Sequence, residues 1–403
     1  MRSESAKGPA RLGTISALGI IQIFAWGSSY YLPAILSKPI AADTGWGLPL
    51  VSAGLSLALL ASALLAPRVG RLIRDRGGRD AVIGGLALLA TGLVLLGSAS
   101  TIPVYALAWI IIGAGMSGTL YDAAFSTLGR YYGYDARSAI TTLTLFGGFA
   151  STICWPLSAA LLDHAGWRAV CFAFAALHLI LCIPLAFRFL PRVEGAAAAA
   201  GDMPSVPRRT RLTSAERRSL LLLAVIVTTG GTLATVVSVH LIQILQARDV
   251  SLAAAVSFGA LIGPSQVAAR VVDMVVGRRL PAVMTLLTAS ALIAAGVVAL
   301  ASGYHVVALA LVLYGAGNGI WSIARGAVPL ALFGPERFPV LMGGLATPNL
   351  VAQSLAPPLS AAIMQGSGAD RIIQLLAGAS LANVALALLL AFVATRPRGI
   401  VAA

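Results

Sequence analysis

Residues 50–99 read LVSAGLSLALLASALLAPRVGRLIRDRGGRDAVIGGLALLATGLVLLGSA, and this stretch contains the pattern that decides the fold. An apolar run at 50–69 and a second one at 81–99 flank a short segment rich in arginine. Each run has about 20 residues, the length of an α-helix that crosses the roughly 30 Å hydrocarbon core of a bilayer. The stretch therefore predicts two transmembrane helices joined by a basic loop.

The composition of the whole chain agrees with this pattern. Of its 403 residues, 58% are hydrophobic and 10% are charged, whereas about 25% of the residues of soluble domains are charged. Such a composition excludes a soluble or disordered protein and argues against an enzyme with an aqueous cleft. The net charge of +14 comes from Lys and Arg residues that alternate with the apolar runs, so it does not indicate a nucleic-acid partner.

The three cysteines, Cys154, Cys171 and Cys182, all lie inside apolar runs. Free cysteines in such surroundings behave as small hydrophobic residues, and their spacing matches no zinc motif. We therefore expect no disulfide, no metal site and no cofactor.

Apolar windows separated by short polar segments predict twelve transmembrane helices, the first of which is too long for the core of a cleaved signal peptide. An even number of spans places both termini on one side of the membrane. That side contains 22 of the 28 Lys and Arg residues, and the opposite side contains four. The positive-inside rule therefore predicts cytoplasmic termini in a plasma (inner) membrane. The expected helices cover residues 14–37, 50–69, 81–99, 103–128, 137–162, 167–188, 218–245, 252–275, 281–301, 305–331, 339–364 and 371–394.

Two segments of the chain recur at an offset of 202 residues. Residues 113–115 (GAG) recur at 315–317, and residues 156–161 (PLSAAL) recur as PLSAAI at 358–363. Two matches at one spacing indicate a duplicated unit, and such duplication is a feature of secondary transporters.

The one long polar interruption, at 191–217, separates six expected spans from six. We therefore predict an all-α polytopic membrane protein with two pseudo-symmetric six-helix halves, 1–190 and 218–403, joined by a cytoplasmic linker at 191–217.

The basic segment Gly70-Arg71-Leu72-Ile73-Arg74-Asp75-Arg76-Gly77-Gly78-Arg79 resembles the loop signature of the major facilitator superfamily, a Gly followed by Asp-Arg and then Gly-Arg. It has one extra residue between Gly70 and Asp75. The resemblance covers all twelve spans, and it implies a secondary transporter that works by alternating access.

Three further segments are similar to the monocarboxylate and oxalate/formate branch of that superfamily. They are Thr44–Gly47, Arg130–Tyr132 with the following 136–139, and Gln266–Arg270. In the last segment Arg270 matches a substrate-binding arginine of the branch, while Gln266 replaces an acid. The lysines that the branch has in its first and eleventh helices are missing, so the resemblance does not imply its proton mechanism.

Charged residues inside the expected spans are the first candidates for function, because each costs about 2.5–3.5 kcal/mol on insertion scales. Arg270 lies on one helical face with Gly259, Gly263, Gln266 and Asp273. A guanidinium there can hold a carboxylate in a bidentate manner. The alternative is a structural pair of Arg270 with Asp273 at the membrane boundary.

Asp122 and Arg325 lie in the fourth and tenth helices, which the resemblance implies are equivalent and line the transport pathway. We expect them to form a charge pair that loosens when a substrate or a proton binds; a permanent pair or two unrelated charges are the alternatives. Polar and aromatic residues of the first, fourth and tenth helices complete the predicted substrate site. They are Gln22, Tyr30, Tyr121, Asn318 and Trp321.

The basic loops predict a gate on the cytoplasmic side. A carboxylate at a helix end can pair with a helix N-terminus or with an arginine and hold one conformation closed. The expected gating residues are Gly70, Asp75, Arg76, Gly78 and Arg79 in the first half and Asp273, Arg278 and Arg279 in the second.

Together these features predict a monomeric secondary transporter for a small organic anion, with a carboxylate as the expected substrate and a proton as the expected coupled ion. Efflux of drug-like or amphipathic compounds is the alternative, although the Gly-Pro-x-x-Gly-Gly signature of drug antiporters is absent from the fifth helix. A sensor that binds without transport is a further alternative. The four histidines are scattered, so we expect no catalytic site.

Overall fold

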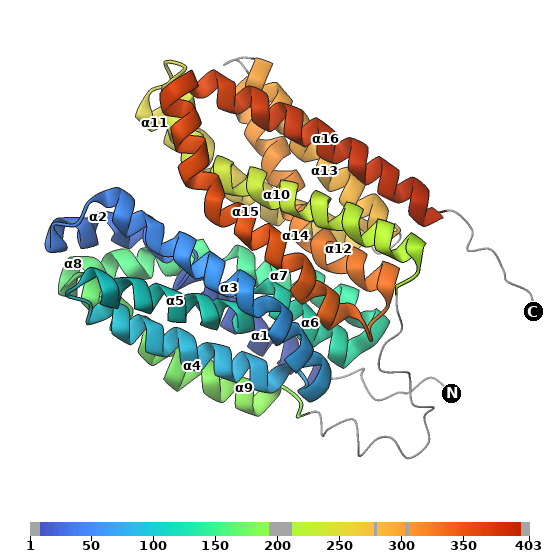
Figure 1. Ribbon diagram of the computed structural model, residues 1–403, viewed down its shortest axis with the longest axis horizontal. Coiled ribbons are helices and arrows are strands. Elements are labelled where there is room, and N and C mark those ends of the chain that lie inside the picture. The colour runs from blue at the N-terminus through green and yellow to red at the C-terminus, as the bar shows by residue number, and fades with distance from the viewer. Residues whose placement is uncertain (1–8, 193–211, 278–279, 303–305, 396–403) are drawn as a thin grey trace, which may run out of the picture. The chain divides into compact units, whose positions relative to one another are not determined.

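The computed structural model describes residues 9–192, 212–277, 280–302 and 306–395, and within these ranges the chain forms helices joined by short turns, with no β-strand (Figure 1). In a bilayer every backbone polar group must be bonded inside the protein, and apolar helices meet this condition. The prediction of an all-α fold is confirmed.

The first part of the chain contains nine α-helices in the described residues: α1 (Pro9–Gly27), α2 (Leu32–Thr44), α3 (Leu48–Arg76), α4 (Gly78–Gly97), α5 (Ile102–Thr119), α6 (Tyr121–Tyr132), α7 (Ala136–Gly148), α8 (Ala150–Leu177) and α9 (Ile183–Phe189). A 3-10 turn, η2 (Gly133–Asp135), precedes α7, and a π-helical segment, η3 (His178–Cys182), precedes α9.

The second part contains seven: α10 (Ser214–Gln246), α11 (Leu252–Gly259), α12 (Ile262–Val276), α13 (Ala282–Ser302), α14 (Val307–Phe333), α15 (Phe338–Ser367) and α16 (Ala369–Thr395). Helix α10 begins inside the predicted linker because Thr213 and Glu216 form a reciprocal capping box, with the Glu216 backbone N–H donating to Thr213 Oγ1 over 3.2 Å. Residues 193–211 of that linker lie outside the described ranges.

Several expected spans consist of two helices, because the chain breaks within the membrane-spanning length. The first span is interrupted at Ser28–Tyr31, and the fourth at Leu120, which is extended with φ −75° and ψ −177°. The expected fifth and sixth spans meet inside α8 at Gly166, where the backbone is not helical and has a φ of +79° that favours glycine.

Within the described residues, nine helical stretches are long and apolar enough to cross a membrane. One of them, Ile102–Phe189, has 88 residues and contains three of the expected spans. Counted in this way, and with the 30-residue helix α15, the stretches correspond to the twelve spans predicted from the sequence.

The basic loop after the second span is shorter than we expected. Helix α3 continues to Arg76, so Gly70, Asp75 and Arg76 lie in its last turns, and α4 begins at Gly78. Arginines near a helix C-terminus interact favourably with the helix dipole, which explains the extension. Gly77 alone makes the turn, with a φ of +83° that a residue with a side chain rarely adopts.

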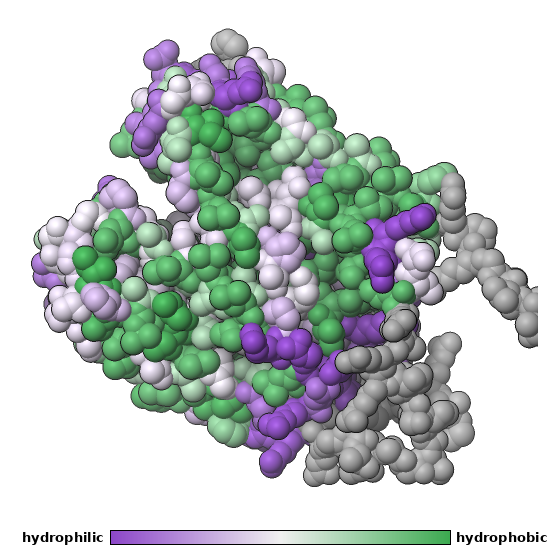
Figure 2. Space-filling view, in the orientation of Figure 1, coloured by the Kyte–Doolittle hydropathy of each residue, from purple (hydrophilic) through white to green (hydrophobic). Residues whose placement is uncertain are grey.

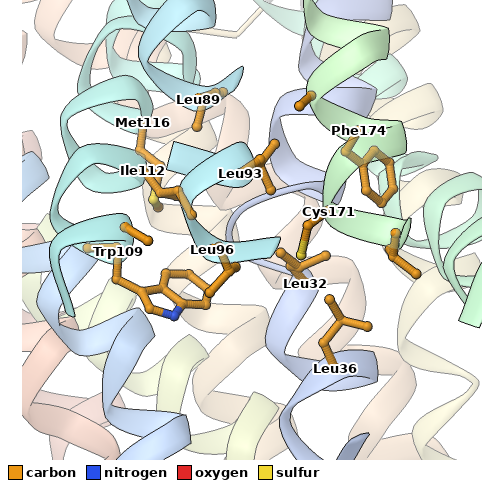
Figure 3. Close-up of a cluster of buried hydrophobic side chains, with 14 of the residues drawn as sticks. Leu32, Leu36, Leu89, Leu93, Leu96, Trp109, Ile112, Met116, Cys171 and Phe174 are labelled. Carbon is orange, nitrogen blue, oxygen red and sulfur yellow. The ribbon is translucent and has the colours of Figure 1, made fainter. Parts of the chain in front are cut away.

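The helices form two compact units, one of residues 1–206 with 334–355 and the other of 207–333 with 356–403. In the first unit, a buried core of α2, α4, α5 and α8 packs around Leu93, Trp109 and Phe174 (Figure 3). On the face shown in Figure 2, hydrophobic residues cover the lengths of the helices and hydrophilic residues gather near their ends, as expected for helices in lipid. The boundaries of the two predicted six-helix halves stay a prediction.

The repeated GAG segments make equivalent contacts in the two units. A Cβ on Gly113 would collide with the backbone of Ala58, and one on Gly315 would collide with Ser265 and the backbone of Ile262. Small residues at such positions let transmembrane helices approach closely. The repeat found in the sequence therefore corresponds to the same close contact between two helices in each unit.

Candidate functional site

The break in the fourth span is held by a buried glutamine. Gln22 of α1 is fully buried, and its Nε2 donates a hydrogen bond to the carbonyl oxygen of Thr119 over 2.5 Å. Helix α5 ends at Thr119, so that carbonyl is one of the last four without a partner inside the helix. The Oε1 of Gln22 accepts a hydrogen bond from Trp26 Nε1 over 3.0 Å. Gln22 thus connects the break to the indole of Trp26.

Around Trp26, five rings form what we call the aromatic cluster: Trp26, Tyr30, Tyr31, Tyr121 and Trp155. The ring centroid of Trp26 lies 5.3 Å from Tyr30, 5.8 Å from Tyr31 and 5.0 Å from Tyr121. Tyr31 also meets Trp155 at 6.2 Å, edge to face. These separations fall in the range of favourable aromatic contacts. The cluster combines residues from both helix breaks with one from α8.

The sequence predicted Gln22, Tyr30 and Tyr121 as parts of one site, and the structure brings all three to Trp26. It did not predict Tyr31 or Trp155. Gly147 of α7 makes room for Tyr121, since a Cβ there would collide with its hydroxyl. Asp122, the next residue along, is half-buried in the first turn of α6.

In the second unit, the predicted substrate-binding arginine lies on α12. Arg270 is 5% exposed, and its Nε donates to the carbonyl oxygen of Gly319 on α14 over 3.4 Å. Its Nη2 donates to Gln266 Oε1, one turn back, over 3.5 Å. Asp273 is also buried, and its carboxylate lies against Gly277. The face predicted from the sequence therefore contains a buried guanidinium and a buried carboxylate.

The second buried arginine lies on α14. The guanidinium of Arg325, a residue that is 9% exposed, lies 5.6 Å from the ring of Trp321, within the range of a cation–π contact. Trp321 packs against α10 at Gly230, where a Cβ would collide with its indole. Among the described residues, the buried Trp321 Nε1 has no hydrogen-bond partner, and it lies against Gly230. Asn318 is half-buried one turn before.

Arg270, Asp273 and Arg325 are the charged side chains that are buried within the described residues. All three lie in the second unit, which therefore buries two arginines and one aspartate. Asp122 belongs to the first unit and Arg325 to the second, and their pairing stays a prediction.

The residues predicted to form a gate have mixed surroundings. Asp75 is exposed and pairs with its neighbour Arg74 at 2.7 Å, and Arg76 is exposed as well. The guanidinium of Arg79 lies 5.1 Å from the ring of Phe187 on α9. Gly78 packs against Thr127 of α6. Arg278 and Arg279 lie outside the described residues, and a gating role for the set stays a prediction.

Gly70 contacts the first part of α15 within the same compact unit. A Cβ on Gly70 would collide with the carbonyl oxygen of Pro339, and one on Gly343 would collide with that of Ala66. Further along, Thr347 Oγ1 donates to the carbonyl oxygen of Ala63 over 2.9 Å. Helices α3 and α15 therefore meet backbone to backbone.

Two ion pairs that the sequence analysis did not predict occupy related places in the repeat. Arg168, after the left-handed Gly166 of α8, binds Asp43 at the end of α2. In the second unit Arg248 pairs with Asp370 at 2.7 Å and also donates to the carbonyl oxygen of Leu300 over 2.6 Å. Positions 168 and 370 differ by the repeat offset of 202, and the side chains there have opposite charges, since one is an arginine and the other an aspartate.

Repeated bundles of apolar helices, with buried charges and broken spans inside them, define a polytopic membrane protein of the transporter class. The family model of the Major Facilitator Superfamily matches residues 18–337. The chain belongs to this superfamily and is a multi-pass secondary transporter of small molecules, not an enzyme.

Solved structures show the same fold. The human organic anion transporter MFSD10 (TETRAN) aligns with a TM-score of 0.73 at 18% identity, covering 94% of this chain and 100% of that one. The fucose:proton symporter FucP of E. coli aligns with a TM-score of 0.68 at 14% identity, covering 95% and 98%. A FucP structure in the outward conformation aligns with a TM-score of 0.72 at 13% identity, covering 95% and 99%. No curated protein sequence matches the chain.

Proposed function

We propose that this transporter moves a small organic anion, with a carboxylate as the substrate, and that it belongs to the monocarboxylate and oxalate/formate branch of its superfamily. The observation that supports the proposal is the burial of two arginines, Arg270 and Arg325, with one aspartate, Asp273, in the second unit. Buried guanidinium groups form a cationic environment, and a carboxylate is an anion whose geometry matches them.

The chemistry of the second unit suits a carboxylate. A guanidinium presents a fork of donors that matches two carboxylate oxygens. The MFSD10 structure is that of an organic anion transporter, which is consistent with the proposal, although at 18% identity the likeness itself concerns the fold.

Coupling to a proton completes the proposal, and Asp122 is the group that binds and releases the proton. We further propose that the protein is a monomer in the plasma (inner) membrane and that both of its termini lie in the cytoplasm. Asp122 supports this role because it is half-buried at the N-terminus of α6, directly after the break at Leu120. Half-helix ends of this kind contribute to ion and substrate sites in transporters.

A thermal-shift screen of the purified protein in detergent tests the substrate class. Mono- and dicarboxylates form one set, and hydrophobic cations and neutral amphiphiles form another. A ligand at 100 times its dissociation constant adds about 2.7 kcal/mol of stability. We expect stabilisation by carboxylates that is lost in Arg270→Ala and strongly weakened in Arg270→Lys, because an ammonium group cannot form the bidentate contact.

Arg371→Lys is the matched control, since Arg371 is an exposed arginine of the same unit, and it should bind carboxylates as the wild type does. Stabilisation by hydrophobic cations alone would refute the proposal and support efflux of amphipathic compounds, which the aromatic cluster of the first unit could accept through cation–π contacts. Binding of a carboxylate without flux in proteoliposomes would indicate a sensor.

A further inference from the structure

The histidine near the end of α10, His240, is buried between two oxygen atoms. It is 5% exposed. Its Nδ1 lies 3.0 Å from Oε1 of Gln243 on the same helix, and its Nε2 lies 3.3 Å from the carbonyl oxygen of Pro357 on α15. All three residues belong to the second compact unit. The imidazole is therefore a polar link between α10 and this part of α15.

The two contacts together suit a ring that carries two protons. A carbonyl oxygen can only accept a hydrogen bond, so Nε2 donates to Pro357 and Nδ1 donates to Gln243 Oε1. A neutral imidazole has one N–H and can donate to only one of the two oxygens. It satisfies both sides only if the amide of Gln243 turns and presents its NH2 group to Nδ1. Protonation of the ring is therefore linked to the orientation of this amide.

The Gln243 side of the ring lies at a polar helix end, where water can supply the proton. Gln243 is exposed, and α10 ends at Gln246, which is exposed as well. In the turn that follows, Arg248 pairs with Asp370 at the beginning of α16, and the side chain of Asp370 is 70% exposed. Nδ1 is therefore the nitrogen that exchanges a proton with water.

The helices that contact α10 contain few other ionisable groups. Helices α11 and α15 contain none. The ionisable residues of α14, of α16, of the rest of α10 and of the turn after it are Glu216, Arg217, Arg218, Arg248, Asp249, Tyr314, Arg325, Asp370 and Arg371. Side chains of these types ordinarily keep one charge between about pH 5 and 8, whereas histidine changes its charge in this range. A response of this region to pH is therefore expected to come from His240.

Helix α15 lacks part of its backbone hydrogen bonding where His240 meets it. Pro357 is followed by Pro358, and neither has a backbone N–H, so two helical hydrogen bonds are missing. The carbonyl oxygen of Pro357 also accepts a hydrogen bond from Ser360 Oγ over 3.1 Å. A hydrogen bond from a charged donor is about twice as strong as one between neutral groups. Protonation of His240 therefore strengthens the contact of α10 with α15 at this position.

We propose that His240 is a proton-binding site whose protonated form locks α10 to α15. Nδ1 takes up a proton from water and donates to Gln243, while Nε2 donates to Pro357. If both termini lie in the cytoplasm, as proposed above, this end of α10 faces the outside, and the lock responds to external acid. Only the sidedness rests on that orientation. The site is separate from Asp122, which lies in the first unit.

NMR of the full-length protein in detergent, with 13C in its histidine rings, measures the ratio of protonated to neutral imidazole. The chain has four histidines, and the signal that is missing in His240→Asn, or in the second variant His240→Gln, belongs to His240. We expect this ring to take up a proton between about pH 5 and 8. Gln243→Glu should raise the ratio about two- to fivefold at a given pH, the size of a partly exposed ion pair. Gln243→Leu should lower it, because Nδ1 loses its acceptor.

Gln246→Glu is the matched control, because Gln246 is an exposed glutamine of the same helix and the substitution adds the same charge. It should leave the ratio unchanged. Hydrogen–deuterium exchange of α15 peptides at about pH 6, within the range in which histidine titrates, tests the lock. Exchange near Pro357 should be slower in Gln243→Glu than in Gln246→Glu. Melting temperatures verify that each variant folds, and Gln243 and Gln246 are exposed, so the comparison does not depend on a substitution in the core.

Each outcome decides one part of the proposal. A ring that titrates, follows the substitutions of Gln243 and slows exchange near Pro357 supports it. Equal effects of Gln243→Glu and Gln246→Glu, or a ring that keeps one charge between about pH 5 and 8, overturn the proton site. A ring that titrates while exchange near Pro357 stays the same overturns the lock. None of these results depends on the substrate or on Asp122, so the proposed function can fail or hold separately.

Discussion

Replacing Gln22 by leucine should destabilise the protein far more than a single lost hydrogen bond would. Interhelical hydrogen bonds in membranes contribute about 0.6 kcal/mol on average. Gln22 makes one, to Thr119 of α5, and accepts a second hydrogen bond within α1 from Trp26. The larger effect comes from the carbonyl group of Thr119. In the leucine variant this group stays buried at the end of α5 without a hydrogen-bond donor, which costs about 1–3 kcal/mol. Leucine has a similar volume, so cavity formation adds little. We expect a loss of about 2–4 kcal/mol in the free energy of unfolding.

Unfolding by SDS in mixed micelles, followed by tryptophan fluorescence, measures this loss. Thr14→Val is the control, because Thr14 is also buried on α1 and donates to a backbone carbonyl, that of Phe189, over 2.8 Å. Phe189 is 40% exposed, so its carbonyl can find water, and the control should lose less than about 1 kcal/mol. Equal losses for Gln22→Leu and Thr14→Val would refute the role of Gln22 at the helix break.

Three more substitutions test other parts of the molecule. Gly343→Leu should abolish uptake in proteoliposomes, because the leucine side chain would collide with the backbone of α3. Gly344→Leu is the control and should transport normally, since there is open space around a Cβ at that position. Equal activities of the two variants would contradict the close contact. Reversing the exposed pair of Asp43 and Arg168 together should restore at least half of the melting-temperature loss of either single reversal, and no restoration would contradict the pairing. Asp75→Asn should change the maximal transport rate and leave substrate affinity unchanged in equilibrium binding, and unchanged flux kinetics would remove Asp75 from the gate.

The positions of the helices could be predicted from the sequence because lipid imposes a simple rule. A span must be apolar for about 20 residues and must bond its own backbone, so hydropathy alone locates it. The same reasoning made charge inside the spans conspicuous, and Arg270, Asp273 and Arg325 are the charged residues that are buried in the described part of the chain. The repeat offset also had a direct structural counterpart in the contacts of Gly113 and Gly315.

The breaks inside the spans were not predicted, because hydropathy does not register a change in backbone direction. Leu120 is apolar and fits a membrane span, yet its extended conformation ends α5 and lets Tyr121 reach Trp26. The end of α3 was placed too early for a related reason. Arginines are counted as loop residues on a hydropathy scale, although they are compatible with the last turn of a helix.

The sequence by itself thus determined that this protein crosses the membrane many times, that its parts repeat, and which charges are buried, since these properties depend on composition and spacing along one chain. Only the tertiary structure decided which side chains meet. The contacts of Trp26 with Tyr121 and of Tyr31 with Trp155 join residues far apart in the sequence, and glycines such as Gly147 are needed to make room for them. Such contacts arise from the packing of several helices at once, which no single segment encodes.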